Sequence, residues 1–407
     1  MNRAIKILIA GICINLCMGV LYAWSVIGKA LVSLGWSNAD AGMPYTIGIV
    51  TFAAGVLIAG NLQDRMGPRN LVIAGAAMVG LGLIASSFVS SPLALLLTFG
   101  VLVGTGIGFA YACLSPSAMK WFHPSRKGMV NGLIAGGFGM ASLYIAPMAS
   151  YLIGEYSIST TFLTLGIGVL VIAVPMACTI VNPPADYKAE APAGYKEPAG
   201  KKDVHNFTWR EMMKTRQFYL MWIAFAFASS AGLMLIGNIT SIALHQGGIQ
   251  EAAYLVSLLA FFNTFGRIGM GMLSDKIGRV NTLLVAIALQ IGNMMLFPTL
   301  TGEMGFAIGA AIAGVGYGAL LSVFPSMTAD FFGMKNYGSN FGVLYTAWGI
   351  SGFMGPVMAS MIVDSTGSYA LAYTISAVML AVAGGMAFMT KPVNVEGMLK
   401  KGELAAV

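Results

Sequence analysis

Arg267 is the residue of this sequence best suited to chemistry, because it is the only charged residue in the apolar run LVSLLAFFNTFGRIGMGML. A cation at the centre of a hydrocarbon layer costs about 2.5 to 3.5 kcal/mol on insertion scales, so an ionisable residue there is by default functional. A guanidinium stays protonated and presents a planar fork that binds a carboxylate through two hydrogen bonds. Arg267 therefore predicts an anion site inside a membrane. The alternative is that its side chain snorkels towards headgroups near Asp275, about 12 Å further along the helix.

The composition indicates an all-α membrane protein. Of the 407 residues, 57% are hydrophobic and 9% charged, with a mean hydropathy of +0.80, whereas soluble domains carry about 25% charged residues. A membrane helix needs about 20 predominantly apolar residues. The sequence divides into twelve such spans: 5–28, 43–62, 70–90, 93–119, 129–150, 159–181, 217–244, 252–273, 281–300, 304–329, 340–363 and 369–390.

The positive charges predict the orientation of these spans. All but Lys29 and Arg267 of the 22 lysines and arginines fall on one side of the predicted membrane. Loops rich in lysine and arginine stay in the cytoplasm. We therefore expect a multi-pass protein of the cell membrane, the inner membrane of a bacterium, with both termini cytoplasmic. The net charge of +7 follows from this topology and predicts no nucleic-acid partner.

The chain contains an internal repeat. A charged, proline-rich linker over 182–216 separates an N-terminal half, 1–181, from a C-terminal half, 217–407. Glycines recur between the halves at an offset of 210 residues: Gly104, Gly106, Gly108, Gly128, Gly132 and Gly139 match Gly314, Gly316, Gly318, Gly338, Gly342 and Gly349. Two six-helix halves of one design are typical of transporters that bind substrate near the midplane between the halves.

A charged motif also occurs twice, as GNLQDRMGPR between the second and third spans and GMLSDKIGR between the eighth and ninth. This pair resembles the signature of the major facilitator superfamily, with Pro68 in the place of the penultimate arginine. Glycines allow a tight turn, and the charged groups can form pairs that break as the halves rock. We expect gating loops formed by Gly60, Asp64, Arg65, Gly67 and Arg69, and by Gly271, Asp275, Lys276, Gly278 and Arg279. The alternative is that these charges only anchor the loops under the positive-inside rule.

Within that superfamily the whole chain resembles the oxalate/formate antiporter family and its monocarboxylate-carrying relatives. The resemblance is carried by GVLYAWSV, YACLSPSAMKWFHPSRKG, FNTFGRIGMGMLSDKIGR and VFPSMTADFFGMKNYGSNFGVLYTAWG. It implies that Arg267 engages the substrate carboxylate and that aromatic residues line the cavity: Tyr22, Trp24, Tyr111 and Tyr317. Aromatic residues at helical spacing are otherwise ordinary packing or interfacial residues.

The resemblance also bears on specificity. The oxalate carrier has a lysine in the eleventh span, and Trp348 stands at that position here. A buried charge without a partner is strongly disfavoured, so one cation suits one carboxylate. We expect a small monocarboxylate such as lactate, pyruvate or formate. In the internal repeat, the residue of the first half that matches Arg267 is Val56, so the repeated fold does not require a charge at this position. Asn238 and Asn263 could bind substrate or join helices.

The coupling mode stays open at this level. No carboxylate lies in the middle of a span to relay protons. The substrate therefore either exchanges for a counter-anion or travels with a proton. His245 could couple transport to protons or form an interfacial hydrogen bond, and Lys29 could attract anions to the outer mouth or anchor the helix.

Other functions are less well supported by the residues. No nucleotide loop, metal cluster or nucleophile with a base is visible, so we expect no cofactor, no metal and no enzyme activity. We expect a monomer whose partners are the lipid bilayer and a carboxylate anion. The alternatives are an oxalate/formate-type dicarboxylate antiporter, a proton-coupled exporter of drugs or sugars, and a sensor that does not transport. The apolar residues of FTWREMMKTRQFY further suggest a short interfacial helix.

Overall fold

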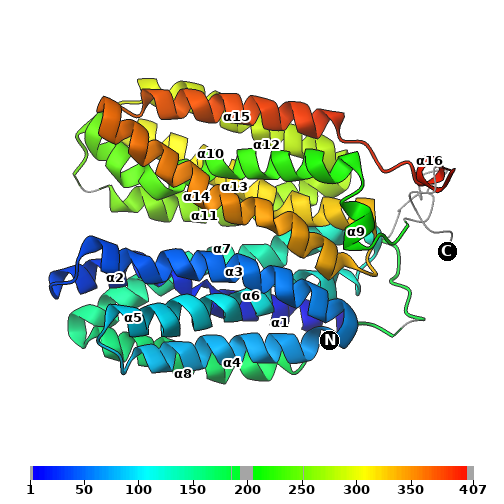
Figure 1. Cartoon of the computed structure of the whole chain (residues 1–407), viewed down its shortest axis with the longest axis horizontal. Coiled ribbons are helices and arrows are strands. Elements are labelled where there is room, and N and C mark those ends of the chain that lie inside the picture. Colours follow the sequence, from blue (N-terminus) through cyan, green and yellow to red (C-terminus); the bar gives the residue numbers. More distant parts are fainter. Residues whose placement is uncertain (1–2, 185, 193–204, 251, 401–407) are drawn as a thin grey trace. The chain divides into compact units, whose positions relative to one another are not determined.

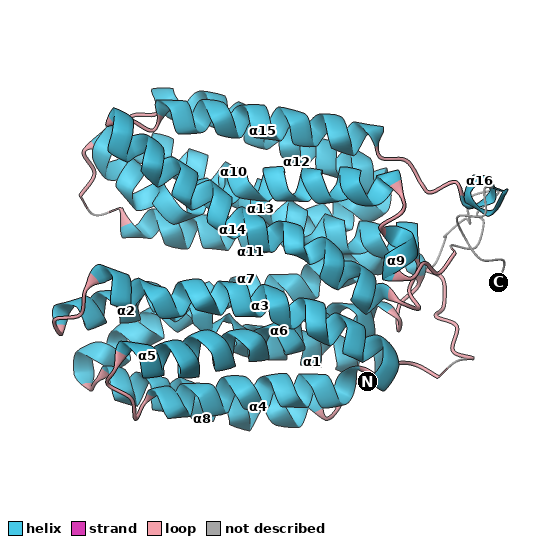
Figure 2. Ribbon diagram, in the orientation of Figure 1, coloured by secondary structure: helices cyan, strands magenta, loops and turns pink. Residues whose placement is uncertain are grey.

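The computed structural model describes residues 3–184, 186–192, 205–250 and 252–400, and every regular element in them is a helix (Figure 2). Twelve helical segments of this described part are long and apolar enough to cross a membrane. They coincide with the twelve predicted spans, although several extend further; the first runs over 3–33 rather than 5–28. The chain is therefore an all-α, multi-pass membrane protein, as the composition predicts.

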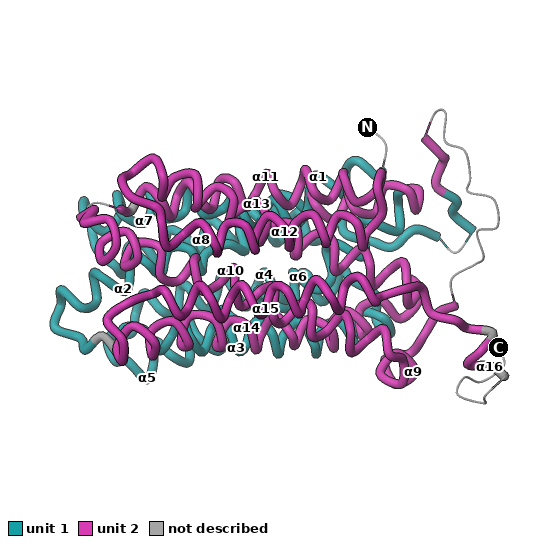
Figure 3. Tube along the Cα trace, turned by 90° about the horizontal axis from the view of Figure 1, so that it is seen from above, with its two compact units in different colours: residues 1–122, 133–188 teal, residues 123–132, 189–407 magenta. Residues whose placement is uncertain are grey.

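The first compact unit comprises residues 1–122 and 133–188 (teal in Figure 3). Its helices are α1 (Arg3–Met18), η1 (Gly19–Ala23), α2 (Trp24–Ser33), α3 (Asn38–Met66), α4 (Pro68–Ser86), α5 (Pro92–Leu95), η2 (Leu96–Val103), α6 (Gly104–Met119), most of α7 (Lys127–Glu155) and α8 (Ile158–Ala177). The first three form one span with a 3-10 segment in its middle. The fourth span contains the π-helical turn η2 between α5 and α6.

The second unit comprises residues 123–132 and 189–407 (magenta in Figure 3). Its elements are η3 (Pro124–Arg126), the start of α7, α9 (Trp209–Met212), α10 (Arg216–Gly247), α11 (Ala253–Ile277), α12 (Arg279–Leu296), η4 (Phe297–Thr299), α13 (Gly302–Phe332), α14 (Tyr337–Thr366), α15 (Ala370–Met389) and α16 (Val395–Lys400). The spatial units differ from the division along the chain in two ways: residues 123–132 belong to the second unit, and the linker 182–216 is divided between the units after residue 188.

Local chemistry sets many helix ends. The hydroxyl of Ser37 accepts a hydrogen bond from the backbone N–H of Asp40 at 3.0 Å, and Ser157 and Thr215 cap α8 and α10 in the same way. Both charged motifs form a turn of one residue. Gly67 (φ 80°) separates α3 from α4, and Gly278 (φ 89°) separates α11 from α12. These φ values favour glycine, which explains the glycine shared by the two motifs.

The sequence repeat reappears as a packing repeat. In unit 1, α3 packs on α6, and a methyl group added at Gly108 would lie 2.8 Å from the Cα of Gly55. In unit 2, α11 packs on α13, and a methyl group added at Gly318 would lie 2.9 Å from the backbone nitrogen of Arg267. In each unit the second and fourth spans of the half therefore run side by side at close approach, which small residues permit (Figure 1).

The segment expected to form a short interfacial helix contains one, and part of its apolar face packs on unit 2. Phe207 and Met212 are fully buried, whereas Trp209 and Met213 are partly exposed. The backbone N–H of Phe207 donates to the carbonyl of Phe332 at 3.0 Å. Only Trp209–Met212 is helical, and a capping box of Thr208 and Glu211 begins it. The end of the linker is thus fixed to the turn between α13 and α14.

Candidate functional site

Arg267 is buried near the middle of α11, with 2% of its surface exposed. Its Nε donates a hydrogen bond of 2.9 Å to Oδ1 of Asn263, which is also buried. Asn263 lies one turn nearer the start of α11, so this bond directs the guanidinium away from Asp275. Snorkelling towards the end of α11 is therefore not the conformation that the structure has.

The backbone around Arg267 is held by glycines from two other helices. Gly318 of α13 leaves no room for a side chain against the backbone of Asn263 and Arg267. Gly132, in the first turns of α7, lies against the carbonyl of Arg267, and a methyl group there would be 3.2 Å from the Cα of Ile268. Close-packed backbone on both sides gives the arginine a defined position, which a binding site requires.

Tyr317 and Trp348 contact each other in unit 2. The indole N–H of Trp348 donates to the hydroxyl of Tyr317 at 2.7 Å, and the Trp348 ring stacks on Tyr345 with centroids 5.0 Å apart. Tyr317 packs over Gly232 of α10 and is buried. One hydrogen bond thus joins two of the predicted cavity residues, Tyr317 on α13 and Trp348 on α14.

The unit 1 aromatic residues divide into two groups. Tyr22 and Tyr111 belong to one cluster with Phe52 and Phe138. The ring centroid of Tyr111 lies 5.4 Å from that of Phe52 and 5.6 Å from that of Phe138. The ring centroid of Tyr22 lies 5.8 Å from that of Phe138. Trp24 lies elsewhere: its N–H donates to the carbonyl of Ala41 at 2.9 Å and its ring packs on Phe99. The structure therefore gives Trp24 a packing partner and a hydrogen-bond acceptor of its own.

The two asparagines make bonds within their own helices. Asn238 donates to the carbonyl of Met234 at 2.9 Å, one turn earlier in α10, and Asn263 accepts from Arg267. These bonds do not join helices. Asn263 thus orients the guanidinium, whereas the bond of Asn238 is local to α10.

The second charged motif organises a network where α11 ends. Oδ1 and Oδ2 of Asp275 accept from the backbone N–H groups of Gly128 and Met129 at 2.8 Å each, at the beginning of α7. Arg279 donates to Asp275 at 2.7 Å and to Asp330 of α13 at 2.8 Å. A carboxylate at a helix N-terminus is favoured by the helix dipole and by the N–H groups there. Asp275 and Arg279 therefore link α11, α12, α13 and the start of α7.

Sequence reasoning missed three members of the charged networks. Lys127 bonds to Asp330 at 2.9 Å, yet the sequence marks these two only as charges near span ends. In unit 1, the pKa of Lys120 is lowered because burial disfavours the ammonium form, while the Asp64 carboxylate acts in the opposite direction. Their position in the repeat could have indicated them, because Lys120 and Asp330 both lie where the fourth helix of a half ends.

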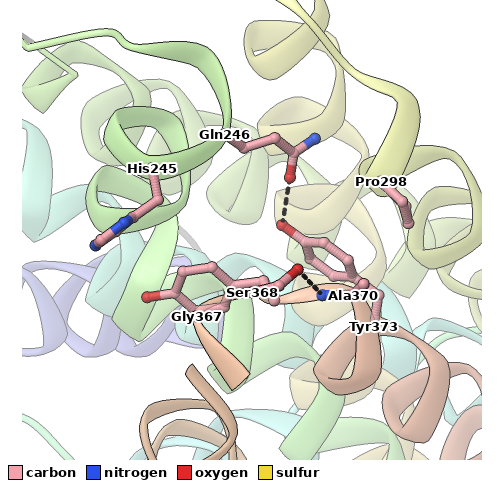
Figure 4. Close-up of a pocket in the computed structure, with 8 residues that line it drawn as sticks. His245, Gln246, Pro298, Gly367, Ser368, Ala370 and Tyr373 are labelled. Carbon is pink, nitrogen blue, oxygen red and sulfur yellow. Dashed lines mark hydrogen bonds between the residues drawn. The ribbon is translucent and has the colours of Figure 1, made fainter. Parts of the chain in front are cut away.

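His245 lines a pocket of about 160 Å³ where α10 ends and α15 begins (Figure 4). Most polar groups there are occupied: the Tyr373 hydroxyl donates to Gln246, whose amide donates to the carbonyls of Phe297 and Leu300 at 2.6 and 3.0 Å. This pocket contains none of the predicted substrate residues. In the described part of the chain, no three acidic, histidine or cysteine residues come close enough to hold a metal ion.

The fold and the paired motifs define the class of protein, a membrane transporter built from two six-helix halves. A profile of the Major Facilitator Superfamily matches residues 7–303. The chain belongs to the major facilitator superfamily. Its fold is similar to that of the transporter FucP in the outward conformation, with a TM-score of 0.72 at 13% identity, covering 95% of this chain and 100% of that one. Proteins of this family are transporters, and the chain is a transporter rather than an enzyme.

Several curated proteins are similar to the chain over most of its length. An uncharacterized MFS-type transporter of Escherichia coli K12, YhjX, is 29% identical over 84% of both chains. The oxalate:formate antiporter of Oxalobacter formigenes is 28% identical over 96% of this chain and 92% of its own. Human monocarboxylate transporter 2 is 24% identical over 86% of this chain and 82% of its own. These relatives agree with the resemblance drawn from the motifs.

Proposed function

We propose that the protein is a secondary transporter of small monocarboxylates, such as lactate, pyruvate or formate, and that Arg267 binds the carboxylate. The observation that carries this proposal is a buried arginine whose Nε is fixed by Asn263 in the middle of a membrane helix. The guanidinium offers five donors in a fork that matches a carboxylate, and such charge-assisted bonds are strong in a site without water. Relatives named for the transport of oxalate, formate and monocarboxylates support this substrate class.

The presence of Trp348 favours a substrate with one carboxylate over a substrate with two. Where the resemblance to the oxalate carrier places a lysine, an indole donates to the Tyr317 hydroxyl. An aromatic pair provides contact area and a hydrogen-bonding hydroxyl but no second charge to neutralise a dicarboxylate. We therefore assign Tyr317 and Trp348 to the organic part of the substrate. In unit 1 we assign the same role to the cluster that contains Tyr22 and Tyr111, and we give Trp24 a packing role because of its bond to Ala41.

The charged turns act as gates in this proposal. The end of each unit that carries Gly67 or Gly278 also carries most of the lysines and arginines, so it faces the cytoplasm. There Asp275, Arg279, Asp330 and Lys127 hold the start of α7 on unit 2. Breaking these bonds opens the cytoplasmic side, and re-forming them closes it. In unit 1, Asp64 and the rest of the first motif act in the same way.

The test is uptake by purified protein in proteoliposomes. Labelled lactate, pyruvate, formate and oxalate are supplied in turn, with and without internal anion and with and without an imposed pH gradient. We expect uptake of at least one monocarboxylate. Stimulation by internal anion identifies exchange, and stimulation by an inward proton gradient identifies symport with a proton.

Arg267 is tested in the same assay. Arg267→Ala should reduce uptake by two orders of magnitude or more, because a charge-assisted contact contributes about 1.5–3 kcal/mol and the desolvated anion loses its partner. Arg267→Lys should retain part of the activity, since it keeps the charge but loses the fork. Val56→Ala, at the matching position of the repeat, serves as the control and should transport normally. Full uptake of every carboxylate by Arg267→Ala would falsify the assignment.

A further inference from the structure

Pro325 leaves an acceptor without its usual donor inside α13. In an α-helix the carbonyl of residue 321 accepts from the N–H of residue 325, and proline has no N–H. Pro325 lies within α13 and is buried, as are Leu321 and Ser322. A buried backbone carbonyl that is not hydrogen-bonded is costly, so membrane helices with proline rely on neighbouring side chains to supply donors.

The donor comes from α7. Nδ2 of Asn131 lies 2.9 Å from the carbonyl oxygen of Ser322 and 3.4 Å from that of Leu321, and it donates to both. Asn131 is 1% exposed. It belongs to the segment 123–132 of unit 2, so this contact lies inside that unit. The bond to Leu321 replaces the one that Pro325 removes, whereas the Ser322 carbonyl also accepts from the hydroxyl of Ser326 at 2.9 Å.

The neighbours of Asn131 connect it to the arginine and to the gate. The next residue, Gly132, packs against the carbonyl of Arg267, and Gly128 and Met129 donate to Asp275. The first turns of α7 are therefore held within unit 2 by charged bonds at Asp275 and Asp330 and by an uncharged one from Asn131. From Leu133 onward the same helix belongs to unit 1.

We propose that Asn131 is a positioning residue that holds the start of α7, and with it the contacts of this segment with Asp275 and Arg267, on the proline bend of α13. Pro325 strengthens this contact, because without it the α13 backbone would satisfy the Leu321 carbonyl itself.

A double-mutant cycle on the full-length protein in detergent tests this dependence. Amide hydrogen exchange of peptides covering 127–134 measures how often the start of α7 opens. Asn131→Leu should accelerate this exchange about five- to tenfold, the effect of losing a buried hydrogen bond. In the Pro325→Ala background the same substitution should accelerate exchange by a smaller factor, because residue 325 then supplies an N–H to Leu321 and only the bond to the Ser322 carbonyl is lost. Asn131→Gln keeps a donor and should restore part of the protection.

Asn340 provides the matched control. It is equally buried and its Nδ2 donates to the carbonyl of Phe207 at 2.9 Å, which no proline has deprived of a donor. Asn340→Leu should change amide hydrogen exchange by the same factor whether residue 325 is proline or alanine. Equal acceleration by Asn131→Leu in both backgrounds overturns the inference, as does an effect spread evenly over all helices. Should Asn131→Leu fail to fold, Asn131→Ser, which is too short to reach the carbonyls, takes its place in the cycle. Exchange is read without substrate, so an absence of carboxylate uptake would reject the proposed function and leave this test intact.

Discussion

At the level of single residues, the proposed function depends on one charge. Arg267 is buried, and Asn263 holds its Nε from the preceding turn of the same helix. An arginine that is oriented before substrate arrives loses less conformational entropy when it binds. The matching residue of the first half, Val56, is fully buried and apolar, so the repeat tolerates both types. We therefore propose that specificity for anions is a property of Arg267 and of the Asn263 amide that orients it.

Trp348 provides a test of specificity at this scale. We expect Trp348→Lys to strengthen oxalate binding by about tenfold or more, because a second cation can pair with the second carboxylate through a charge-assisted bond. The measurement is the concentration of oxalate that halves uptake of the transported monocarboxylate. Trp348→Phe, which removes the bond to Tyr317 without adding a charge, should leave oxalate binding unchanged. A failure of lysine to improve oxalate binding would reject the argument that one cation selects one carboxylate.

At the scale of elements, glycines decide how closely the helices approach. Gly318 of α13 touches the backbone of α11 at Asn263 and Arg267, whereas Gly269 of α11 has open space where a side chain would be. In a membrane, helices associate mainly through close packing and hydrogen bonds, since lipid is as apolar as their side chains. The glycine at 318 therefore supports the arginine from the neighbouring helix.

Alanine substitutions at Gly318 and Gly269 distinguish the effect of helix packing on stability from the effect of helix propensity. Gly318→Ala should destabilise the protein by about 1–3 kcal/mol, the usual cost of overpacking, and lower uptake by displacing Arg267. Gly269→Ala should be neutral or slightly stabilising, because alanine favours the helix and meets no atom. Thermal unfolding in detergent and uptake in proteoliposomes measure the two effects. Equal thermal unfolding midpoints for the two variants would contradict the packing argument.

At the level of the whole molecule, the proposed gate requires that the bonds at the start of α7 break without unfolding the helices. Asp330 accepts bonds from Lys127 and Arg279, and Arg279 also bonds to Asp275. Removing one member of a partly buried charge network leaves its partners uncompensated. The network therefore stabilises the state in which the start of α7 is docked on unit 2.

Asp330→Asn should favour the cytoplasm-open state, because it keeps the size of the side chain and removes its charge. The reporter is Val130→Cys, a position in the first turns of α7 that is fully buried, in a protein whose exposed Cys178 is replaced by serine. We expect a maleimide added from the cytoplasmic side to label this cysteine about tenfold faster when Asp330 is changed. Asp364→Asn, at the other end of unit 2, is the control and should have no effect. Unchanged labelling would show that Asp330 does not hold the gate.

Features that depend on local pattern follow from the sequence alone. Hydropathy over windows of about 20 residues predicts the twelve helices, the glycine spacing predicts the repeat, and a lone charge marks Arg267 as a candidate site. Which side chains meet depends on the tertiary structure: Asp330 contacts Lys127, Trp348 contacts Tyr317, and Asn131 contacts the carbonyls beside Pro325. Periodicity and composition act along the chain, whereas a hydrogen bond between residues 191 positions apart depends on how helices pack.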